Sequence, residues 1–319
     1  MMQKIRYTVL KIFYRLVRLV YVLKKSPLKK WGSIFFKTRQ QILLDAIILH
    51  YGNNGKFQEE VDFLKERKEL TIFPYKRIKQ VGNIVSGYDS IKNLPYVIHK
   101  NRKLYFARSW TEEKSLWKYK DFIENENILG GGYMEKAPHQ YQSESFHVKN
   151  SDILLDVGCA EALFALDVID KVKKVILFES DPIWFEPLKA TFEKEINEGK
   201  VVLIEKNVGE HDTSKSIIIA SVLQNEDFES LFIKMDIEGN EVEVVKSCTN
   251  LMKSDKDIRF SCCTYHRTND ADTLKNMFES NGYKIEYSDG YILFLLDKHI
   301  KYPYFRKGII RATNFNSHN

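Results

Sequence analysis

Residues 152–160 read Asp152-Ile153-Leu154-Leu155-Asp156-Val157-Gly158-Cys159-Ala160, an apolar run that ends in an acid and a tight glycine turn. At such a turn, the backbone amides of the next helix can approach a ligand closely. A second apolar run, Val175-Ile176-Leu177-Phe178-Glu179, follows after one helix length. Its terminal acid, Glu179, stands where a βαβ nucleotide fold places a carboxylate to accept the ribose hydroxyls. The two runs therefore predict neighbouring parallel strands that bind an adenosine-containing cofactor.

The glycine pattern narrows the choice of cofactor. A dinucleotide fingerprint needs three glycines so that the backbone can press against a pyrophosphate, whereas here Gly158 is followed by Ala160 and Ala162. No lysine follows Gly158 in the Gly-x-x-x-x-Gly-Lys arrangement that cradles the phosphates of a nucleoside triphosphate. A cofactor without phosphates remains, and S-adenosylmethionine (SAM) is the common one. The alternative is a buried strand, turn and helix with no ligand.

Strands and helices alternate regularly from residue 151 onward. The predicted parallel strands are 153–156, 175–179, 201–205, 231–236 and 258–265. Two further runs, 283–287 and 291–296, are joined by Ser288-Asp289-Gly290, a hairpin signal. The sequence thus predicts an α/β fold, a doubly wound, Rossmann-like sheet of seven strands that closes with a C-terminal antiparallel hairpin. This is the architecture of SAM-dependent methyltransferases, and a mainly helical N-terminal extension precedes it.

The ends of the fourth and fifth strands carry the chemistry. The fourth opens into Asp236-Ile237-Glu238-Gly239-Asn240-Glu241, and His266 follows the fifth. Ligands bind at the carboxyl ends of parallel strands, so Asp236, Glu238 and His266 are predicted to be catalytic. An alcohol that attacks a sulfonium methyl must lose its proton, and His266 is the predicted base because the pKa of histidine, about 6.5, lies near working pH. Asp236 or Glu238 would orient His266 or hold the acceptor hydroxyl.

Two other interpretations of these residues stay open. The acids can be first-turn residues that favour a helix dipole, and this interpretation is preferred for Glu241. Asp236, Glu238 and His266 can also hold a divalent metal ion. Nothing else in the sequence has ligand spacing, and no metal is predicted.

The same runs resemble the FkbM family of SAM-dependent methyltransferases. The resemblance rests on Asp156-Val157-Gly158, Phe178-Glu179-Ser180-Asp181-Pro182, Pro138-His139-Gln140-Tyr141 and, most specifically, Ile233-Lys234-Met235-Asp236-Ile237-Glu238-Gly239. It covers about residues 130–297 and implies O-methylation, often of sugar hydroxyls in glycans or glycosylated metabolites. The implied cofactor-binding residues are Asp156, Gly158, Cys159, Ala160, Glu179, Ser180, Asn207 and Asp236. One departure is Ala162, which stands where the family generally has glycine.

Charge is distributed unevenly along the 319 residues. Eleven Lys and Arg precede Asp45, the first acid, which leaves 38 Lys and Arg against 43 Asp and Glu in the rest of the chain. Residues 1–31 are predicted to form a basic amphipathic helix, either at an anionic membrane surface or packed on protein. The other expected regions are an accessory region at 32–129, the methyltransferase domain at 130–300 and a basic tail at 301–319.

The leading hypothesis is a cytosolic SAM-dependent O-methyltransferase, with possible attachment to the inner face of the membrane through residues 1–31 and a hydroxyl-bearing acceptor, most simply a saccharide. The alternative is a catalytically silent scaffold at a membrane-associated glycan assembly site. Nucleic acid is not predicted as a partner, because the domain is acidic and contains no Asn/Asp-Pro-Pro-Tyr element for a base amine. The four cysteines have no framework spacing and are predicted to be reduced, packed thiols.

Overall fold

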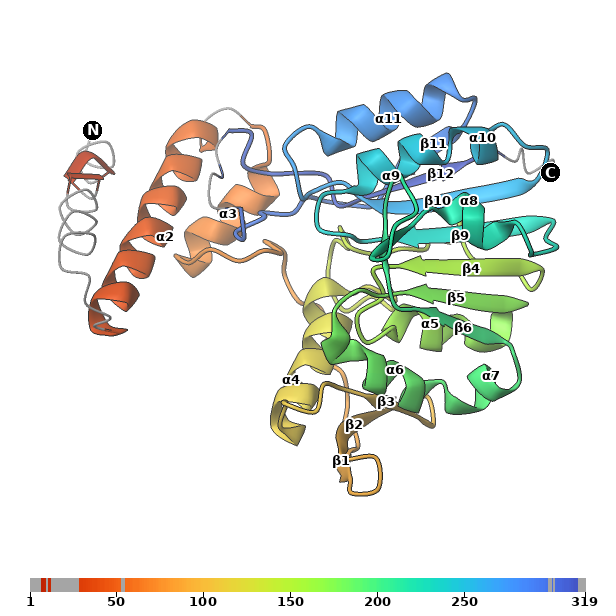
Figure 1. Cartoon of the computed structure of the whole chain (residues 1–319). Coiled ribbons are helices and arrows are strands. Elements are labelled where there is room, and N and C mark those ends of the chain that lie inside the picture. The colour runs from red at the N-terminus through yellow and green to blue at the C-terminus, as the bar shows by residue number, and fades with distance from the viewer. Residues whose placement is uncertain are drawn as a thin grey trace. The chain divides into compact units, whose positions relative to one another are not determined.

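Figure 1 shows a computed structural model of the chain. The structure describes residues 7–9, 11–12, 29–52, 55–297, 300 and 302–314, with side chains from residue 37 onward in helix α2. Most of the basic helix predicted for residues 1–31 lies outside the described residues, so this helix stays a prediction. Within the described residues, no helix combines the length and the apolar character needed to cross a lipid bilayer.

The chain forms two compact units whose boundaries differ from the four predicted regions. One unit combines Met1–Lys76 with Tyr291–Phe305, and the other combines Arg77–Gly290 with Arg306–Asn319. The first contains α2 (Lys29–Tyr51) and α3 (Gln58–Arg67). Leu293 and Phe305 are buried in one apolar cluster with side chains of both helices. This burial explains why the segment 291–305 belongs with the N-terminal helices and not with the sheet.

The second unit is built on a mixed seven-stranded sheet. Its strands are β4 (Asp152–Val157), β5 (Lys174–Phe178), β6 (Val201–Ile204), β9 (Ser230–Met235), β10 (Asp257–Cys263), β11 (Lys284–Tyr287) and β12 (Ile309–Thr313). They lie in the order β11-β12-β10-β9-β4-β5-β6, and β12 is antiparallel to both of its neighbours. The first strand, β4, therefore lies between β5 and β9. This topology confirms the predicted doubly wound α/β class with an antiparallel pair at its C-terminal end.

The prediction that residues 283–287 and 291–296 form a hairpin was wrong. Residues 291–296 form no strand, and β11 pairs instead with Ile309–Thr313, which lies in the region predicted to be a basic tail. Ile309, Ile310 and Ala312 are fully buried there. Arg311 is accommodated because its guanidinium donates to the carbonyls of Gln140 and Gln142 and pairs with Glu286.

Helices and short elements connect the strands. After β4 come α5 (Leu163–Val168) and η2 (Ile169–Lys171); after β5 come η3 (Pro182–Trp184), α6 (Phe185–Thr191) and α7 (Glu193–Asn197); later come β7 (Asn207–Val208), β8 (Ser216–Ile217), α8 (Ile219–Leu223), α9 (Glu241–Ser247), α10 (Thr249–Met252) and α11 (Asp270–Ser280). The predicted helix start at Asp181 and Pro182 is confirmed, because the Asp181 carboxylate accepts a hydrogen bond from Ile183 N at 3.0 Å.

A small antiparallel sheet and a helix precede β4 in this unit. The sheet consists of β1 (Ser86–Asp89), β2 (Leu94–His99) and β3 (Arg102–Tyr105), and α4 (Glu112–Asp121) follows. Helix α4 runs into a π-helical turn, η1 (Phe122–Glu126). The predicted accessory region 32–129 is thus divided between the two units.

The two faces of the large sheet differ in chemistry. On one face Ile233, Met235 and Cys262 pack into an apolar core with helices α8 to α11. Because successive side chains of a strand point to opposite faces, Lys234 and Cys263 lie on the other face, as predicted for the adjacent cysteines. All four cysteines are free and buried, which agrees with packed thiols. The chain segment 138–148 packs against part of this second face, where the His147 and Tyr141 carbonyls accept hydrogen bonds from Arg259 and Ser261 of β10.

Candidate active site

The turn after β4 lies directly against the end of β9. Gly158 has a φ of +72°, and a Cβ at this position would come within 2.0 Å of the Asp236 carbonyl oxygen. Only glycine therefore permits both the turn and the close approach of the two strand ends. Ala160 and Ala162 also adopt positive φ values, 47° and 59°. Alanine thus occupies left-handed positions that glycine would take more easily.

A cavity of about 490 Å³ opens beside this turn. It is lined by Gly158, Ala160, Phe178, Glu179, Ser180, Asp181, Trp184, Lys206, Asn207, Val208, Asp236, Ile237, Glu238 and Asn240. The Glu179 carboxylate accepts hydrogen bonds from the backbone amides of Ala160 at 2.8 Å, Ser180 at 2.7 Å and Asp181 at 2.8 Å. Glu179 therefore lies at the cavity wall and holds the turns that follow β4 and β5, while its predicted contact with a ribose stays a prediction.

A smaller cavity of about 110 Å³ shares Gly158, Ala160 and Asp236 with the larger one. Its lining also includes Phe122, Glu126, Ile128, His139, Tyr141, Asp156, Cys159, Glu161, Leu163, Phe164 and Lys234. The Asp156 carboxylate pairs with Lys234 Nζ at 3.0 Å, and Lys234 donates to the Gly158 carbonyl at 2.7 Å. Burial raises the pKa of Asp156 above its usual value, although Lys234 opposes the shift.

Asp236 lies where the two cavities meet. Its Oδ2 accepts a hydrogen bond from the Tyr141 hydroxyl at 2.9 Å and lies 3.4 Å from His139 Nε2. Its Oδ1 lies 3.4 Å from His266 Nε2. Burial would raise the pKa of Asp236, but the hydrogen bond and charge of His139, together with Lys234 and His266, hold this pKa far below its usual range. Asp236 is therefore an ionised carboxylate at neutral pH.

His139 reaches Asp236 from the segment that covers the sheet. Its Nδ1 lies 3.0 Å from a Glu126 carboxylate oxygen, and Lys118 pairs with Glu126 at 2.9 Å. The π-helical turn η1 ends at Glu126, and such turns are frequent at functional sites. Burial would lower the pKa of His139, but its hydrogen bonds to Asp236 and Glu126 raise it to about 9.

Contacts from β10, β12 and the end of β11 hold the segment that carries His139. Ser288 Oγ donates to the Pro138 carbonyl at 2.7 Å, and Ser261 Oγ donates to the Tyr141 carbonyl at 2.8 Å. A Cβ on Gly308 would lie 1.6 Å from the Pro138 carbonyl oxygen, so glycine is required for this close approach. The position of His139 thus depends on strands far away in the sequence.

The predicted catalytic residues lie together but are not equally accessible. His266 lies beside Asp236, yet it lines neither of these two cavities, and its Nδ1 is 2.8 Å from the fully buried Glu241 carboxylate. The Glu238 side chain is 81% exposed, lies 3.8 Å from His266 Nε2 and lines the larger cavity. His266 is therefore placed to orient Asp236 from behind, and Glu238 to meet a ligand.

Each residue of the predicted cofactor site lines one of the two cavities. Gly158, Ala160, Glu179, Ser180, Asn207 and Asp236 line the larger cavity, while Asp156 and Cys159 line the smaller one. Sequence reasoning assigned no role to His139, Tyr141, Glu161 or Lys234. Two signals were in the sequence, the Pro138-His139-Gln140-Tyr141 run and the lysine two residues before Asp236, but neither carries a spacing that fixes its partner.

Fold and site together define a doubly wound α/β protein with a nucleotide-type crevice at the carboxyl ends of β4, β5 and β9. No family model and no curated protein matches the chain. Among solved structures, the methyltransferase FkbM from Methylobacillus flagellatus KT is 20% identical with a TM-score of 0.41, over 54% of this chain and 45% of that one. The chain thus spans less than half the length of that protein.

Two further solved structures are each similar over about half of the chain. The precorrin-6y C5,15-methyltransferase from Geobacter metallireducens GS-15 is 14% identical with a TM-score of 0.35, over 52% of this chain and 82% of that one. An rRNA methylase from Streptococcus thermophilus is 10% identical with a TM-score of 0.31, over 52% and 87%. TM-scores this low carry no argument about function. The function proposed below is inferred from the residues of the site.

Proposed function

We propose that the chain is a SAM-dependent O-methyltransferase that methylates a hydroxyl, with a saccharide of a glycan or glycosylated metabolite as the acceptor. The observation that carries this proposal is the position of Asp236. This ionised carboxylate lies at the junction of a nucleotide-sized cavity and a smaller acidic cavity. A methyl group bound at that junction would meet an acceptor oxygen that approaches Asp236.

The residues present fit SAM in two parts. The larger cavity would take the adenosine, with Glu179 at the ribose and Asn207 near the adenine. The smaller cavity would take the methionine end, where Asp156 and Glu161 supply acidic groups for an ammonium ion. The Asp156 carboxylate is fully buried, and among the described residues its two oxygens have only the Lys234 ammonium and the backbone amide of Ala165 as partners. A buried acceptor of this kind is expected to find a donor in the ligand.

When bound, SAM supplies an electrophilic methyl group on a positively charged sulfur. Asp236 would accept a hydrogen bond from the acceptor hydroxyl and orient its oxygen toward the methyl group, and the hydroxyl proton would pass to solvent as the oxygen–methyl bond forms and the sulfur–methyl bond breaks. Tyr141 and His139 orient Asp236 through Oδ2, and His266 orients it through Oδ1. In this proposal His266 is a positioning residue, whereas the sequence had predicted it to be the base.

The lining of the larger cavity favours a hydroxyl-rich acceptor. Trp184 supplies an aromatic face, and Glu238 and Asn240 supply hydrogen-bonding groups beside Asp236. Aromatic faces combined with carboxylate and amide groups suit ligands that present both C–H surfaces and hydroxyls. A saccharide has this combination.

Calorimetry with SAM and S-adenosylhomocysteine tests the cofactor. Wild type is expected to bind both, and Glu179→Gln is expected to bind about 10- to 100-fold more weakly, because a hydrogen bond to a charged group contributes about 1.5–3 kcal/mol. Glu205→Gln is the matched control, since Glu205 follows the next strand but pairs with Lys189 outside the cavity lining. A folded wild type that binds neither compound would favour the silent scaffold.

Mass spectrometry of surface polysaccharide tests the acceptor. Cells that lack the gene are expected to lose one methyl ether, and the wild-type gene should restore it. The Asp236→Asn gene should not, because the amide removes the negative charge and one of the two acceptor oxygens that would orient the hydroxyl. Unchanged polysaccharide in cells without the gene would contradict a saccharide acceptor there, even if the purified protein binds SAM.

A further inference from the structure

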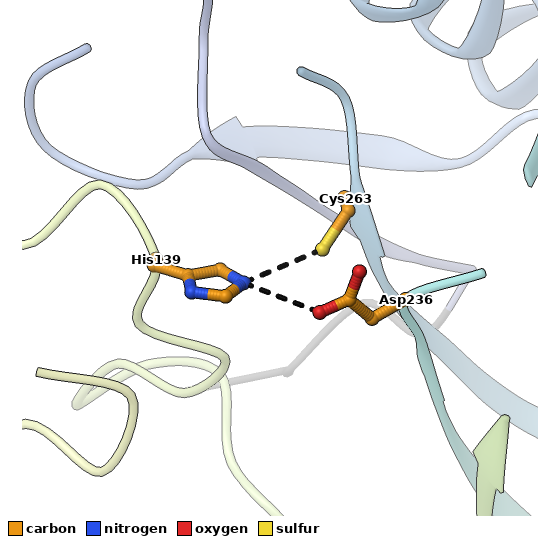
Figure 2. A group of neighbouring side chains, drawn as sticks. All are labelled: His139, Asp236 and Cys263. Carbon is orange, nitrogen blue, oxygen red and sulfur yellow. Dashed lines mark hydrogen bonds and ion pairs between the residues drawn. The ribbon is translucent and has the colours of Figure 1, made fainter. Parts of the chain in front are cut away.

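Three side chains from distant parts of the sequence converge behind the smaller cavity. Figure 2 shows His139, from the segment before β4, pointing toward Asp236 at the end of β9 and Cys263 at the end of β10. His139 Nε2 lies 3.4 Å from Asp236 Oδ2 and 3.6 Å from Cys263 Sγ. One ligand atom from each residue falls within 4.8 Å of the others. His139 and Cys263 are buried, and Asp236 is partly exposed toward the cavities.

The separations within this cluster match those between ligands around one metal ion. The same ring nitrogen, His139 Nε2, also lies 3.1 Å from the Tyr141 hydroxyl and 3.2 Å from the Tyr265 hydroxyl. Four polar groups therefore surround a nitrogen that carries at most one proton, and a distance of 3.4 Å to Asp236 is long for an N–H···O hydrogen bond. Zinc lies about 2.0–2.2 Å from nitrogen and oxygen ligands and about 2.3 Å from sulfur, so tetrahedral ligands are about 3.3–3.6 Å apart. The nitrogen therefore already lies at such distances from the oxygen and from the sulfur, and the oxygen and sulfur lie within 4.8 Å of each other.

The surroundings of His139 also suit a metal ligand. A histidine that binds a metal through one ring nitrogen usually donates its other N–H to a carboxylate. Glu126 takes this role at 3.0 Å from Nδ1, and Lys118 holds Glu126 in place. This hydrogen bond keeps a proton on Nδ1, and metal uptake would displace the second imidazole proton from Nε2, which lies beside Asp236 and Cys263.

A second group of possible ligands, Asp236, Glu241 and His266, is explained without an ion. His266 Nδ1 and the Glu241 carboxylate are 2.8 Å apart, which is an ordinary hydrogen bond. Glu241 also accepts a hydrogen bond from the backbone amide of Ile237 at 3.0 Å. These two contacts fix the start of α9 and leave His266 to orient Asp236.

We propose that His139, Asp236 and Cys263 bind one divalent transition-metal ion of the zinc type. The mixture of imidazole, carboxylate and thiolate donors suits Zn²⁺ better than Mg²⁺ or Ca²⁺, which prefer oxygen ligands. Binding requires the Cys263 thiol to lose its proton, so metal uptake releases a proton to solvent.

Three protein ligands leave one position for a water molecule or a substrate oxygen. His139 and Asp236 both line the smaller cavity, so this fourth position faces the ligand space, which is the pattern of catalytic zinc sites. An acceptor hydroxyl bound there would lose its proton more easily. This use of the ion rests on the proposed methyl transfer, whereas the metal site itself does not.

Metal content tests the site without SAM or an acceptor. Tag-free protein is stripped with a chelator, dialysed against Zn²⁺ or Co²⁺ and passed over a desalting column before elemental analysis. Wild type is expected to retain about one equivalent, and the Co²⁺ form is expected to show visible bands of tetrahedral cobalt with a near-ultraviolet thiolate-to-cobalt band.

The adjacent cysteines provide a matched pair of variants. Cys263→Ala is expected to lose the thiolate band and to bind Zn²⁺ at least 10-fold more weakly. Cys262→Ala removes an equally buried thiol from the apolar face of the same strand and is expected to keep both properties. His139→Gln, which keeps a polar side chain, is a second variant expected to lose the ion. Wild type that retains no metal, or Cys263→Ala that matches Cys262→Ala, would overturn the proposal.

Discussion

Glu161 lines the smaller cavity, where its charge would respond to a bound ligand. Its side chain is buried, and burial raises its pKa to about 7, with Lys118 and Lys234 lowering it only in part. A carboxyl group with this pKa changes its charge within the physiological range. An ammonium group in the cavity would favour the ionised form, so ligand binding and proton release are expected to be coupled.

The first prediction concerns the pH dependence of stability through Glu161. A raised folded-state pKa contributes stability that is present below the unfolded value, about 4.5, and is lost as the pH rises through about 7. Relative to Glu161→Gln, wild type should therefore lose up to about 3 kcal/mol of unfolding free energy between pH 5 and 8. Urea denaturation at several pH values measures this. Glu144→Gln, at an exposed acid, is the control, and parallel curves for wild type and Glu161→Gln would contradict the assignment.

Residues at strand ends were predictable from the sequence, and residues placed by tertiary contacts were not. Asp156, Glu179 and Asp236 follow apolar runs, and parallel strands bring such ends to one edge of a sheet. His139 is placed by Ser288 and Gly308, which lie far along the chain and contact the Pro138 carbonyl. No local pattern encodes a contact of that kind.

At the scale of elements, strand β12 is the piece that completes the site. Ile309–Thr313 lies between β10 and β11, and Arg311 from this strand holds the carbonyls of Gln140 and Gln142. The sequence favoured 291–296 as the strand because this apolar run follows the hairpin signal Ser288-Asp289-Gly290. Leu293 is instead buried with α2 and α3, and Tyr291 and Leu295 pack against the same cluster. Strand propensity was therefore present in both segments, and packing partners decided between them.

The second prediction is that β12 is required for folding. A chain that ends after Lys307 loses Ile309, Ile310 and Ala312 from the core and leaves β10 and β11 without a shared neighbour. The loss should exceed the whole stability of a typical domain, about 5–15 kcal/mol. Circular dichroism and thermal melting should show no cooperative transition. A chain that ends after Asn314 is the control and should melt like wild type, whereas equal melting of both truncated chains would disprove the role of β12.

At the scale of the whole molecule, charge divides the chain into a basic N-terminal end and an acidic remainder. The first acid is Asp45, and eleven cations precede it. Residues 1–28 contain seven of them, on a predicted amphipathic helix. Helix α2 begins at Lys29. A chain that starts at Lys29 therefore lacks these seven cations and keeps the whole of α2.

The third prediction is that residues 1–28 attach the protein to anionic membranes. Each Lys or Arg close to an anionic surface contributes about 1 kcal/mol, and salt screens this attraction. Full-length protein should sediment with vesicles that contain phosphatidylserine at low salt and be released at high salt, whereas the chain that starts at Lys29 should stay in the supernatant. Zwitterionic vesicles are the control, because their bilayer has the same apolar interior but its surface carries no net charge. If both chains sediment equally with anionic vesicles, the basic helix is not the attachment, and packing on protein becomes the better account of its apolar face.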